Sequence, residues 1–222
     1  LKQYFRLVCL ILRHKPDLVY IPAGQTSVGY LRDAGFILLS KLLGRRVICH
    51  LRGGNFLPWY RSAPPLVRAV VRFTHAKVDG QIVLADNLRP LFNWILPEER
   101  IFTVPNGLNR DRPLRETRSG PLRLLYLSNY IRSKGVMEVL EAIRQLHSEG
   151  EAVECTLAGG WNEPDTEKEI RAFLSRYGSL PLNVLGPVSG GEKDSLLGSA
   201  DVFLLPSYYV NEGLPWALVE AM

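Results

Sequence analysis

The stretch Pro206-Ser-Tyr-Tyr-Val-Asn-Glu-Gly-Leu-Pro-Trp-Ala-Leu-Val-Glu-Ala-Met222 decides the fold expected of this 222-residue chain. The apolar run Val202 to Leu205 just before it predicts a β-strand, and the residues that follow Pro215 predict a helix. The loop between them carries Glu212 and Gly213. A strand that passes through such a loop into a helix is typical of α/β proteins, which bind ligands at the carboxyl ends of their strands.

The residues of this loop suit a ligand that carries both phosphate and hydroxyl groups. The amides of Gly213 and Leu214 precede the expected helix, at the end where the helix dipole favours an anion. Glu212 stands at the mouth of this anion site, and Glu220 follows it by eight residues, about 12 Å along a helix axis. Two carboxylates on either side of an anion site predict a ligand with sugars at both ends and phosphate in the middle, which describes a nucleotide sugar.

The same stretch carries a resemblance to a known family. The spacing Glu212-x7-Glu220, set between Pro206-Ser207 and Ala221-Met222, resembles the signature of retaining glycosyltransferases of the family 4, or group 1, type. The resemblance implies the α/β GT-B fold, in which two Rossmann-like domains face a cleft. It also implies transfer of a sugar from a UDP- or GDP-linked donor to a glycan or a lipid-linked glycan, as in the biosynthesis of lipopolysaccharide and other surface polysaccharides. No cofactor and no metal are expected.

The resemblance assigns roles to the two carboxylates and to a second loop. Glu212 is expected to orient the donor sugar and to stabilise an oxocarbenium-like transition state, and Glu220 to accept hydrogen bonds from the ribose. Gly186 and Val188 are expected in the loop whose backbone meets the nucleotide base. The sequence leaves open whether retention would arise through a covalent intermediate or through front-face attack.

A further segment, Tyr126 to Gly135, predicts a strand that ends in a loop with a lysine near a helix start. The family pattern here is Gly-Arg-x4-Lys-Gly, and Lys134 with Gly135 matches its end. Lys134 is therefore expected to stabilise the departing diphosphate. Asn129 stands where the family has its arginine, and Arg132 is the candidate substitute. This departure keeps open one alternative, a non-catalytic nucleotide-binding module or degenerate relative. A hydrolase or epimerase acting on nucleotide sugars with the same fold is a separate alternative, which release of free sugar without an acceptor would favour.

The segment Cys49 to Phe56 predicts a buried strand that opens into a polar loop. The resemblance places His50 where the family presents a histidine to the transferred sugar, and a satisfied core histidine is the alternative. Gly53 and Gly54 are expected to let an acceptor or a donor phosphate approach the backbone. Arg52 joins them in this loop, at a position where relatives often have a second histidine.

Strand-like and helix-like runs alternate along the whole chain, with one interruption. The polar stretch 111–121 is rich in Gly, Pro and charge and predicts a linker between an acceptor-side domain, 1–110, and a donor-binding domain, 122–222. A helix is expected over 133–148. The chain starts without methionine and stops inside an expected helix, so both domains are predicted to be incomplete.

Composition excludes several other classes of protein. No P-loop, G-x-G-x-x-G or G-x-S-x-G motif occurs, and the basic residues are scattered, which disfavours nucleic-acid binding. Three distant cysteines suggest neither disulfides nor zinc, so a cytoplasmic location is expected. The net charge is +5, and basic residues of the first half could bind the inner face of a membrane peripherally, or could simply be solvated; these are Lys41, Arg45, Arg46, Arg61, Arg68 and Arg72.

Overall fold

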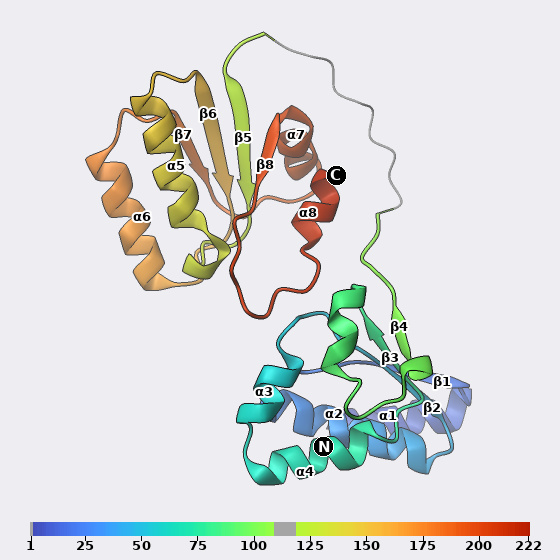
Figure 1. Ribbon diagram of the computed structural model, residues 1–222. Helices are drawn as coiled ribbons and strands as arrows, with labels where there is room; N and C mark the ends of the chain where they lie inside the picture. Colours follow the sequence, from blue (N-terminus) through green and yellow to red (C-terminus); the bar gives the residue numbers. More distant parts are fainter. Residues whose placement is uncertain (1, 109–118) are drawn as a thin grey trace. The chain divides into compact units, whose positions relative to one another are not determined.

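The chain folds into two units, each built on a parallel sheet of four strands (Figure 1). The computed structural model describes residues 2–108 and 119–222. The first unit comprises Leu1–Asn106 together with Val210–Leu214, and the second comprises Gly107–Tyr209 together with Pro215–Met222. The predicted linker, 111–121, lies outside the described residues except for its last three positions. This α/β architecture confirms the predicted fold class.

The sheet of the first unit has the strand order β1-β2-β3-β4. Its strands are β1 (Leu18–Pro22), β2 (Arg46–His50), β3 (Gly80–Val83) and β4 (Ile101–Thr103). Its helices are α1 (Lys2–His14), α2 (Ser27–Leu42), α3 (Phe56–Ser62) and α4 (Pro65–His75), with short 3-10 helices at Asp86–Leu91 and Glu98–Arg100. Pro22 pairs with His50 at the ends of β1 and β2. The loops after both strands therefore leave the sheet at the same edge.

A buried histidine lies in the core of the first unit. His75, the last residue of α4, accepts or donates a hydrogen bond at 3.1 Å to the hydroxyl of Tyr30 on α2. Its ring stacks on Phe92 with the ring centroids 5.1 Å apart. Burial lowers the pKa of His75 from 6.5 to about 4. The imidazole is therefore neutral in the folded protein at neutral pH.

This burial predicts that acid destabilises the first unit. Between pH 6.5 and pH 4 the unfolded chain binds a proton that the folded His75 does not, so the free energy of unfolding decreases as the pH falls through this window. The full shift corresponds to about 3 kcal/mol. Urea unfolding followed at several pH values measures this loss.

The variant His75→Phe should show a shallower acid-side loss than the unchanged chain. The matched variant His147→Phe alters an exposed histidine and should keep the full pH dependence. Equal slopes for His75→Phe and the unchanged chain would show that His75 is not the group responsible.

The second unit has the strand order β7-β6-β5-β8, with helices on both faces of the sheet (Figure 1). Its strands are β5 (Leu122–Leu127), β6 (Val153–Ala158), β7 (Leu182–Leu185) and β8 (Val202–Leu204). Its helices are α5 (Val136–Ser148), α6 (Pro164–Arg176), α7 (Gly190–Ser199) and α8 (Trp216–Ala221). The alternation along β5 decides the layers: Tyr126 packs with residues of α5 and α6, and Leu125 packs with residues of α7 and α8.

The helix expected over 133–148 begins three residues later than predicted. Arg132–Lys134 form a 3-10 turn, and α5 starts at Val136. Gly135 between them has a φ of +81°, a left-handed conformation that interrupts the α-helix. The start of α8 agrees with expectation, since the helix begins at Trp216, directly after Pro215.

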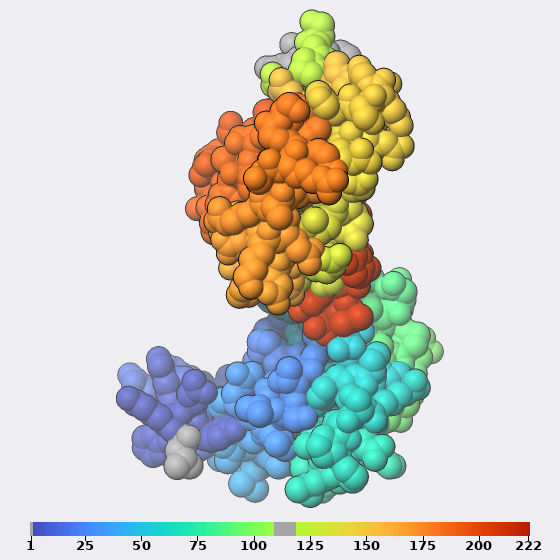
Figure 2. All heavy atoms as spheres, turned by 90° about the vertical axis from the view of Figure 1, so that its left-hand side faces the viewer, coloured from blue at the N-terminus to red at the C-terminus, as the bar shows by residue number. Residues whose placement is uncertain are grey.

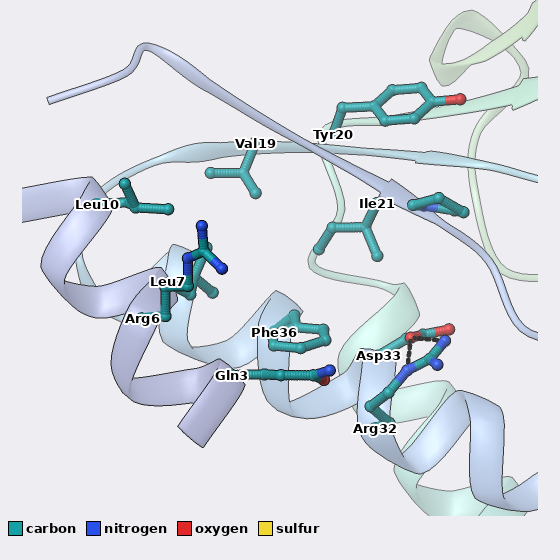
Figure 3. A pocket seen from close by; sticks show the side chains of 11 residues that line it. Gln3, Arg6, Leu7, Leu10, Val19, Tyr20, Ile21, Arg32, Asp33 and Phe36 are labelled. Atoms are coloured by element: carbon teal, nitrogen blue, oxygen red, sulfur yellow. Dashed lines mark hydrogen bonds and ion pairs between the residues drawn. The ribbon is translucent and has the colours of Figure 1, made fainter. Parts of the chain in front are cut away.

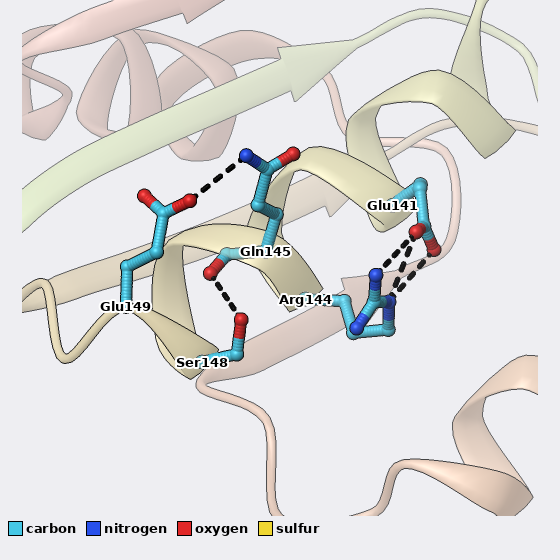
Figure 4. A network of polar contacts seen from close by, with 5 residues as sticks. All are labelled: Glu141, Arg144, Gln145, Ser148 and Glu149. Atoms are coloured by element: carbon cyan, nitrogen blue, oxygen red, sulfur yellow. Dashed lines mark hydrogen bonds and ion pairs between the residues drawn. The ribbon is translucent and has the colours of Figure 1, made fainter.

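Polar side chains cover the outer surfaces of α5 and α6. On α5 the guanidinium of Arg144 pairs with Glu141, and Gln145 donates to Glu149 (Figure 4). On α6, whose outer face is turned to the viewer in Figure 2, Lys168 pairs with Asp165 at 3.1 Å. Exposed pairs of this kind are screened by water and contribute little, so the apolar faces of these helices dominate their stability.

Two of the three cysteines, Cys49 and Cys155, are small buried hydrophobic residues, as the sequence predicts. Cys49 and Cys155 are buried, and burial raises the pKa of each thiol to about 12, which makes both unreactive. Cys9 is exposed on α1. Within the described residues, no helix combines the length and the apolar character needed to cross a membrane.

Candidate functional site

A cavity of about 270 Å³ lies at the carboxyl edge of the second sheet. Its walls are the loops that follow β5, β6 and β7, closed by the start of α7 and by α8. The lining residues are Leu127, Ser128, Asn129, Ala158, Gly159, Gly160, Pro187, Val188, Lys193, Trp216, Ala217 and Glu220. Three residues predicted to bind the donor, Asn129, Val188 and Glu220, therefore share one cavity. Gly186 lies beside it, and its carbonyl accepts a hydrogen bond from Gly159 at 3.2 Å.

The glycines of the cavity let two loops meet closely. A Cβ on Gly159 would stand 1.9 Å from the carbonyl oxygen of Ser128, a distance that no side chain tolerates. Tyr130 reinforces the same junction, because its buried hydroxyl donates to the carbonyls of Leu157 and Leu185 at 2.9 and 2.6 Å. The walls of the cavity are therefore held by backbone contacts between neighbouring strand ends, which preorganises them for a ligand.

Glu220 enters the cavity as half of an ion pair. Its Oε1 accepts from Nζ of Lys193 at 2.5 Å, and the two side chains are only 19% and 27% exposed. Lys193 comes from α7 and Glu220 from α8, so the pair joins two helices across the cavity. A charged partner in this partly buried setting restrains the carboxylate and offsets its charge near a phosphate-bearing ligand.

Asn129 occupies the position of the family's phosphate-binding arginine, and Arg132 is its candidate substitute. The two residues have different surroundings in the structure. The Oδ1 of Asn129 accepts from the amide of Gly160 at 3.3 Å, and Asn129 lines the cavity. Arg132 pairs with Glu169 of α6, while its own amide donates to Glu163 at 2.9 Å. Arg132 is not among the described residues that line the cavity. In this structure the Arg132 guanidinium is thus engaged by α6, and its predicted phosphate contact stays a prediction.

Lys134 lies in a loop that packs on the segment following β8. Its Nζ stands 4.6 Å from the ring centroid of Tyr209, a cation–π contact. The amide of Tyr208 donates to the carbonyl of Ser133 at 2.9 Å. Next to Lys134, a Cβ on Gly135 would meet the carbonyl oxygen of Pro206 at 2.3 Å. The backbone of Pro206–Tyr209 therefore determines where this lysine sits, and its role toward diphosphate stays a prediction.

In the first unit, the loop after β2 meets the segment Val210–Leu214. The amide of Gly54 donates to the carbonyl of Asn211 at 3.3 Å. A Cβ on Gly54 would stand 2.6 Å from the carbonyl oxygen of Glu212, and one on Gly213 would stand 2.7 Å from that of Arg52. Residues predicted from two distant motifs are thus neighbours here. In this structure, glycine is needed at positions 54 and 213 because two stretches of backbone approach each other closely. Contact of Gly53 and Gly54 with a ligand stays a prediction.

His50 ends β2 and is 9% exposed. Its Nδ1 shares a hydrogen bond with the hydroxyl of Tyr20 on β1. Its Nε2 is buried and has no hydrogen-bond partner among the described residues. Burial lowers the pKa of His50, and the charge of Arg52 lowers it further. The imidazole is thus neutral at neutral pH. Its Nδ1 is hydrogen-bonded to Tyr20, and its Nε2 has no hydrogen-bond partner among the described residues.

A second cavity, of about 370 Å³, lies in the first unit between α1, β1 and α2 (Figure 3). Its floor is apolar, with Val19, Ile21 and Phe36, and Asp33 at its edge accepts from the amide of Gly24 at 2.9 Å. Tyr20 lines it as well. None of the predicted site residues lines this cavity.

Three residues were not predicted from the sequence. Lys193 and Trp216 line the cavity of the second unit, and Tyr20 is the hydrogen-bond partner of His50 in the first unit. Trp216 follows Pro215 directly, so its position at the start of the expected helix was available as a signal. Lys193 and Tyr20 offered none, because nothing in the sequence indicates which distant side chain each one meets. Among residues 2–108 and 119–222, no group of three His, Cys, Asp or Glu side chains is arranged to hold a metal ion.

Solved structures of similar architecture define the fold as GT-B. The structure of Anabaena HepE in complex with UDP-glucose superposes with a TM-score of 0.70 at 18% identity, over 98% of this chain and 60% of that one. The lipopolysaccharide outer core galactosyltransferase WaaB superposes with a TM-score of 0.63 at 15% identity, over 99% of this chain and 57% of that one. At this level of identity, the two superpositions show the fold alone.

The chain belongs to the family described as glycosyl transferases group 1, whose sequence profile matches residues 109–222. The amylovoran biosynthesis glycosyltransferase AmsK of Erwinia amylovora is 31% identical over 135 residues, which are 57% of this chain. The match spans only 32% of the length of AmsK. The resemblance inferred from the Glu212-x7-Glu220 spacing is thereby confirmed at the level of the family.

Proposed function

We propose that this chain is part of a retaining glycosyltransferase that takes a sugar from a UDP- or GDP-linked donor. The observation that carries the proposal is the cavity at the carboxyl edge of β5, β6 and β7, with Glu220 inside it. Ligands of α/β sheets bind at this edge. Membership of the group 1 family and the UDP-glucose complex of the structurally similar HepE support a nucleotide-sugar ligand.

In this proposal the nucleoside occupies the cavity. Trp216, Pro187 and Val188 offer apolar surface to the base, and the free oxygen of the Glu220 carboxylate accepts hydrogen bonds from the ribose hydroxyls. The other carboxylate oxygen, Oε1, stays paired with the ammonium of Lys193. The diphosphate then meets the amides of Gly213 and Leu214 and the ammonium of Lys134, groups suited to an anion.

The reaction breaks the bond between the anomeric carbon and the β-phosphate oxygen of the donor. The electron pair of this bond leaves with the diphosphate, whose charge Lys134 and backbone amides stabilise. Glu212 supplies negative charge to the oxocarbenium-like centre, and His50 hydrogen-bonds a hydroxyl of the transferred sugar. The acceptor hydroxyl attacks the anomeric carbon with retention, and its proton passes to an oxygen of the departing diphosphate. We propose a glycan or lipid-linked glycan of surface-polysaccharide biosynthesis as the acceptor, by analogy with AmsK, the amylovoran biosynthesis glycosyltransferase.

Nucleotide binding to this chain tests the donor site. Calorimetry with UDP, GDP and ADP should reveal preference for one of them, and Glu220→Ala should weaken that binding by about 1–3 kcal/mol, the contribution of hydrogen bonds to a charged group. The control Glu138→Ala removes an exposed helical glutamate of α5 and should leave affinity unchanged. Unchanged affinity in Glu220→Ala would remove the ribose role.

A second candidate function is a nucleotide-binding module without transferase activity. Asn129 bonds to Gly160 and Arg132 pairs with Glu169, an arrangement that leaves the family's phosphate arginine unreplaced in this structure. Release of nucleoside diphosphate from the donor sugar separates the two candidates. Turnover favours the transferase, whereas tight binding of intact donor without turnover favours the module.

A further inference from the structure

Tyr20 and His50 form a pair at the carboxyl ends of the two strands β1 and β2. Pro22 of β1 pairs in register with His50, and Tyr20 stands two residues before Pro22, so its side chain lies on the same face of the sheet. The hydroxyl of Tyr20 reaches Nδ1 of His50, and the two rings meet edge to face with centroids 5.7 Å apart. The orientation of the imidazole is therefore set from the neighbouring strand.

The chemistry of the two groups decides which one donates. A phenol is a far better proton donor than a neutral imidazole, since its pKa is about 10. An imidazole nitrogen is in turn a better acceptor than a phenol oxygen. Because His50 is neutral when buried, the favoured arrangement is Tyr20 O–H donating to Nδ1 of His50, which leaves the imidazole proton on Nε2.

The Nε2–H that results is buried and lacks an acceptor among the described residues. A buried donor left unsatisfied is costly, so a native structure supplies it with a partner from outside the chain, such as a bound water, an ion or a ligand. The partner of an N–H is an oxygen with a lone pair, such as a sugar hydroxyl. This reasoning rests on the proposed function for the identity of the ligand, but the tautomer itself does not depend on it.

We propose that Tyr20 is a positioning residue that holds His50 in the Nε2–H tautomer, so that His50 acts on the sugar as a hydrogen-bond donor and not as a general base. Tyr20 has no role of its own toward the ligand in this scheme. Its hydroxyl acts only through the imidazole of His50.

Nitrogen NMR of the chain labelled with ¹⁵N-histidine tests the tautomer directly. The signals of His50 are identified by their loss in His50→Gln. In the unchanged chain at pH 7.5 or above, about one unit over the ordinary histidine pKa, we expect a single neutral form with the proton on Nε2 and a hydrogen-bonded Nδ1. In Tyr20→Phe the Nδ1 signal should shift to that of an unbonded nitrogen, with both tautomers populated.

The control variant is Tyr4→Phe, which removes another hydroxyl of the first unit, one that donates to the carbonyl of Arg32 at 3.0 Å. It should leave the His50 signals unchanged. The signals of the buried His75 report in every variant that the first unit is folded. A proton on Nδ1 in the unchanged chain, or identical His50 signals in Tyr20→Phe, would overturn the proposal.

Donor turnover separates this proposal from the proposed function. Tyr20→Phe should lower turnover about tenfold, the effect of one lost hydrogen bond, with nucleotide affinity unchanged. Full turnover in Tyr20→Phe would overturn the positioning role. Absence of turnover and of nucleotide binding in the unchanged chain would overturn the proposed function, while the NMR spectra still decide the tautomer.

Discussion

Gly135→Ala is expected to destabilise the second unit strongly. The φ of +81° disfavours alanine by about 1–2 kcal/mol. The new Cβ would also stand 2.3 Å from the carbonyl oxygen of Pro206 and 2.8 Å from its carbonyl carbon. Backbone atoms cannot rotate away as a side chain does, so the loop and the segment after β8 must separate. We expect a total loss of about 4 kcal/mol or more, measured by hydrogen exchange of the α5 amides.

The chain offers a matched control for this substitution. Gly150, just after α5, has a φ of +82°, and a Cβ built there meets no described atom within 4 Å. Gly150→Ala therefore isolates the conformational cost and should destabilise by about 1 kcal/mol. Equal losses in the two variants would mean that the contact with Pro206 is not tight in solution. Loss of nucleotide binding only in Gly135→Ala would further link this contact to the position of Lys134.

Glu212→Ala is expected to abolish most of the turnover while leaving nucleotide affinity within about threefold. In the proposed function the carboxylate stabilises charge that develops at the anomeric carbon only in the transition state. Removing one preorganised electrostatic group of this kind typically lowers kcat by about 10²–10³. The measurement is the rate of nucleoside diphosphate release from the donor, together with calorimetric affinity for the nucleotide.

Two further variants give this test its controls. Glu212→Gln keeps the size and the polarity of the side chain and should still be slow, because the charge is what the transition state requires. Glu99→Ala removes an exposed glutamate from the same unit and should be fully active. A greater loss of nucleotide affinity than of kcat in Glu212→Ala would contradict the role assigned to Glu212.

The cavity at the carboxyl edge of the second unit's sheet shows how far the sequence could be interpreted. Asn129 and Val188 follow expected strands, and Glu220 lies in the helix expected after the last strand. Parallel strands bring their carboxyl ends to one edge, so the convergence of these residues was predictable. The partners of these residues were not. Lys193 is 27 residues away from Glu220, and Glu169 is 37 residues away from Arg132. Ion pairs of such separation depend on how α6, α7 and α8 pack on the sheet.

The sequence by itself determined the α/β alternation, the membership of the group 1 family and the burial of Cys49 and Cys155. These follow from local patterns, since the periodicity of apolar residues and the glycines after strands act within a few positions. Only the tertiary structure showed that Gly135 precedes α5 in a left-handed conformation and packs against Pro206. It also showed that the hydroxyl of Tyr20 hydrogen-bonds Nδ1 of His50. Both contacts join residues that are distant along the chain, and their geometry is set by strand register and helix packing.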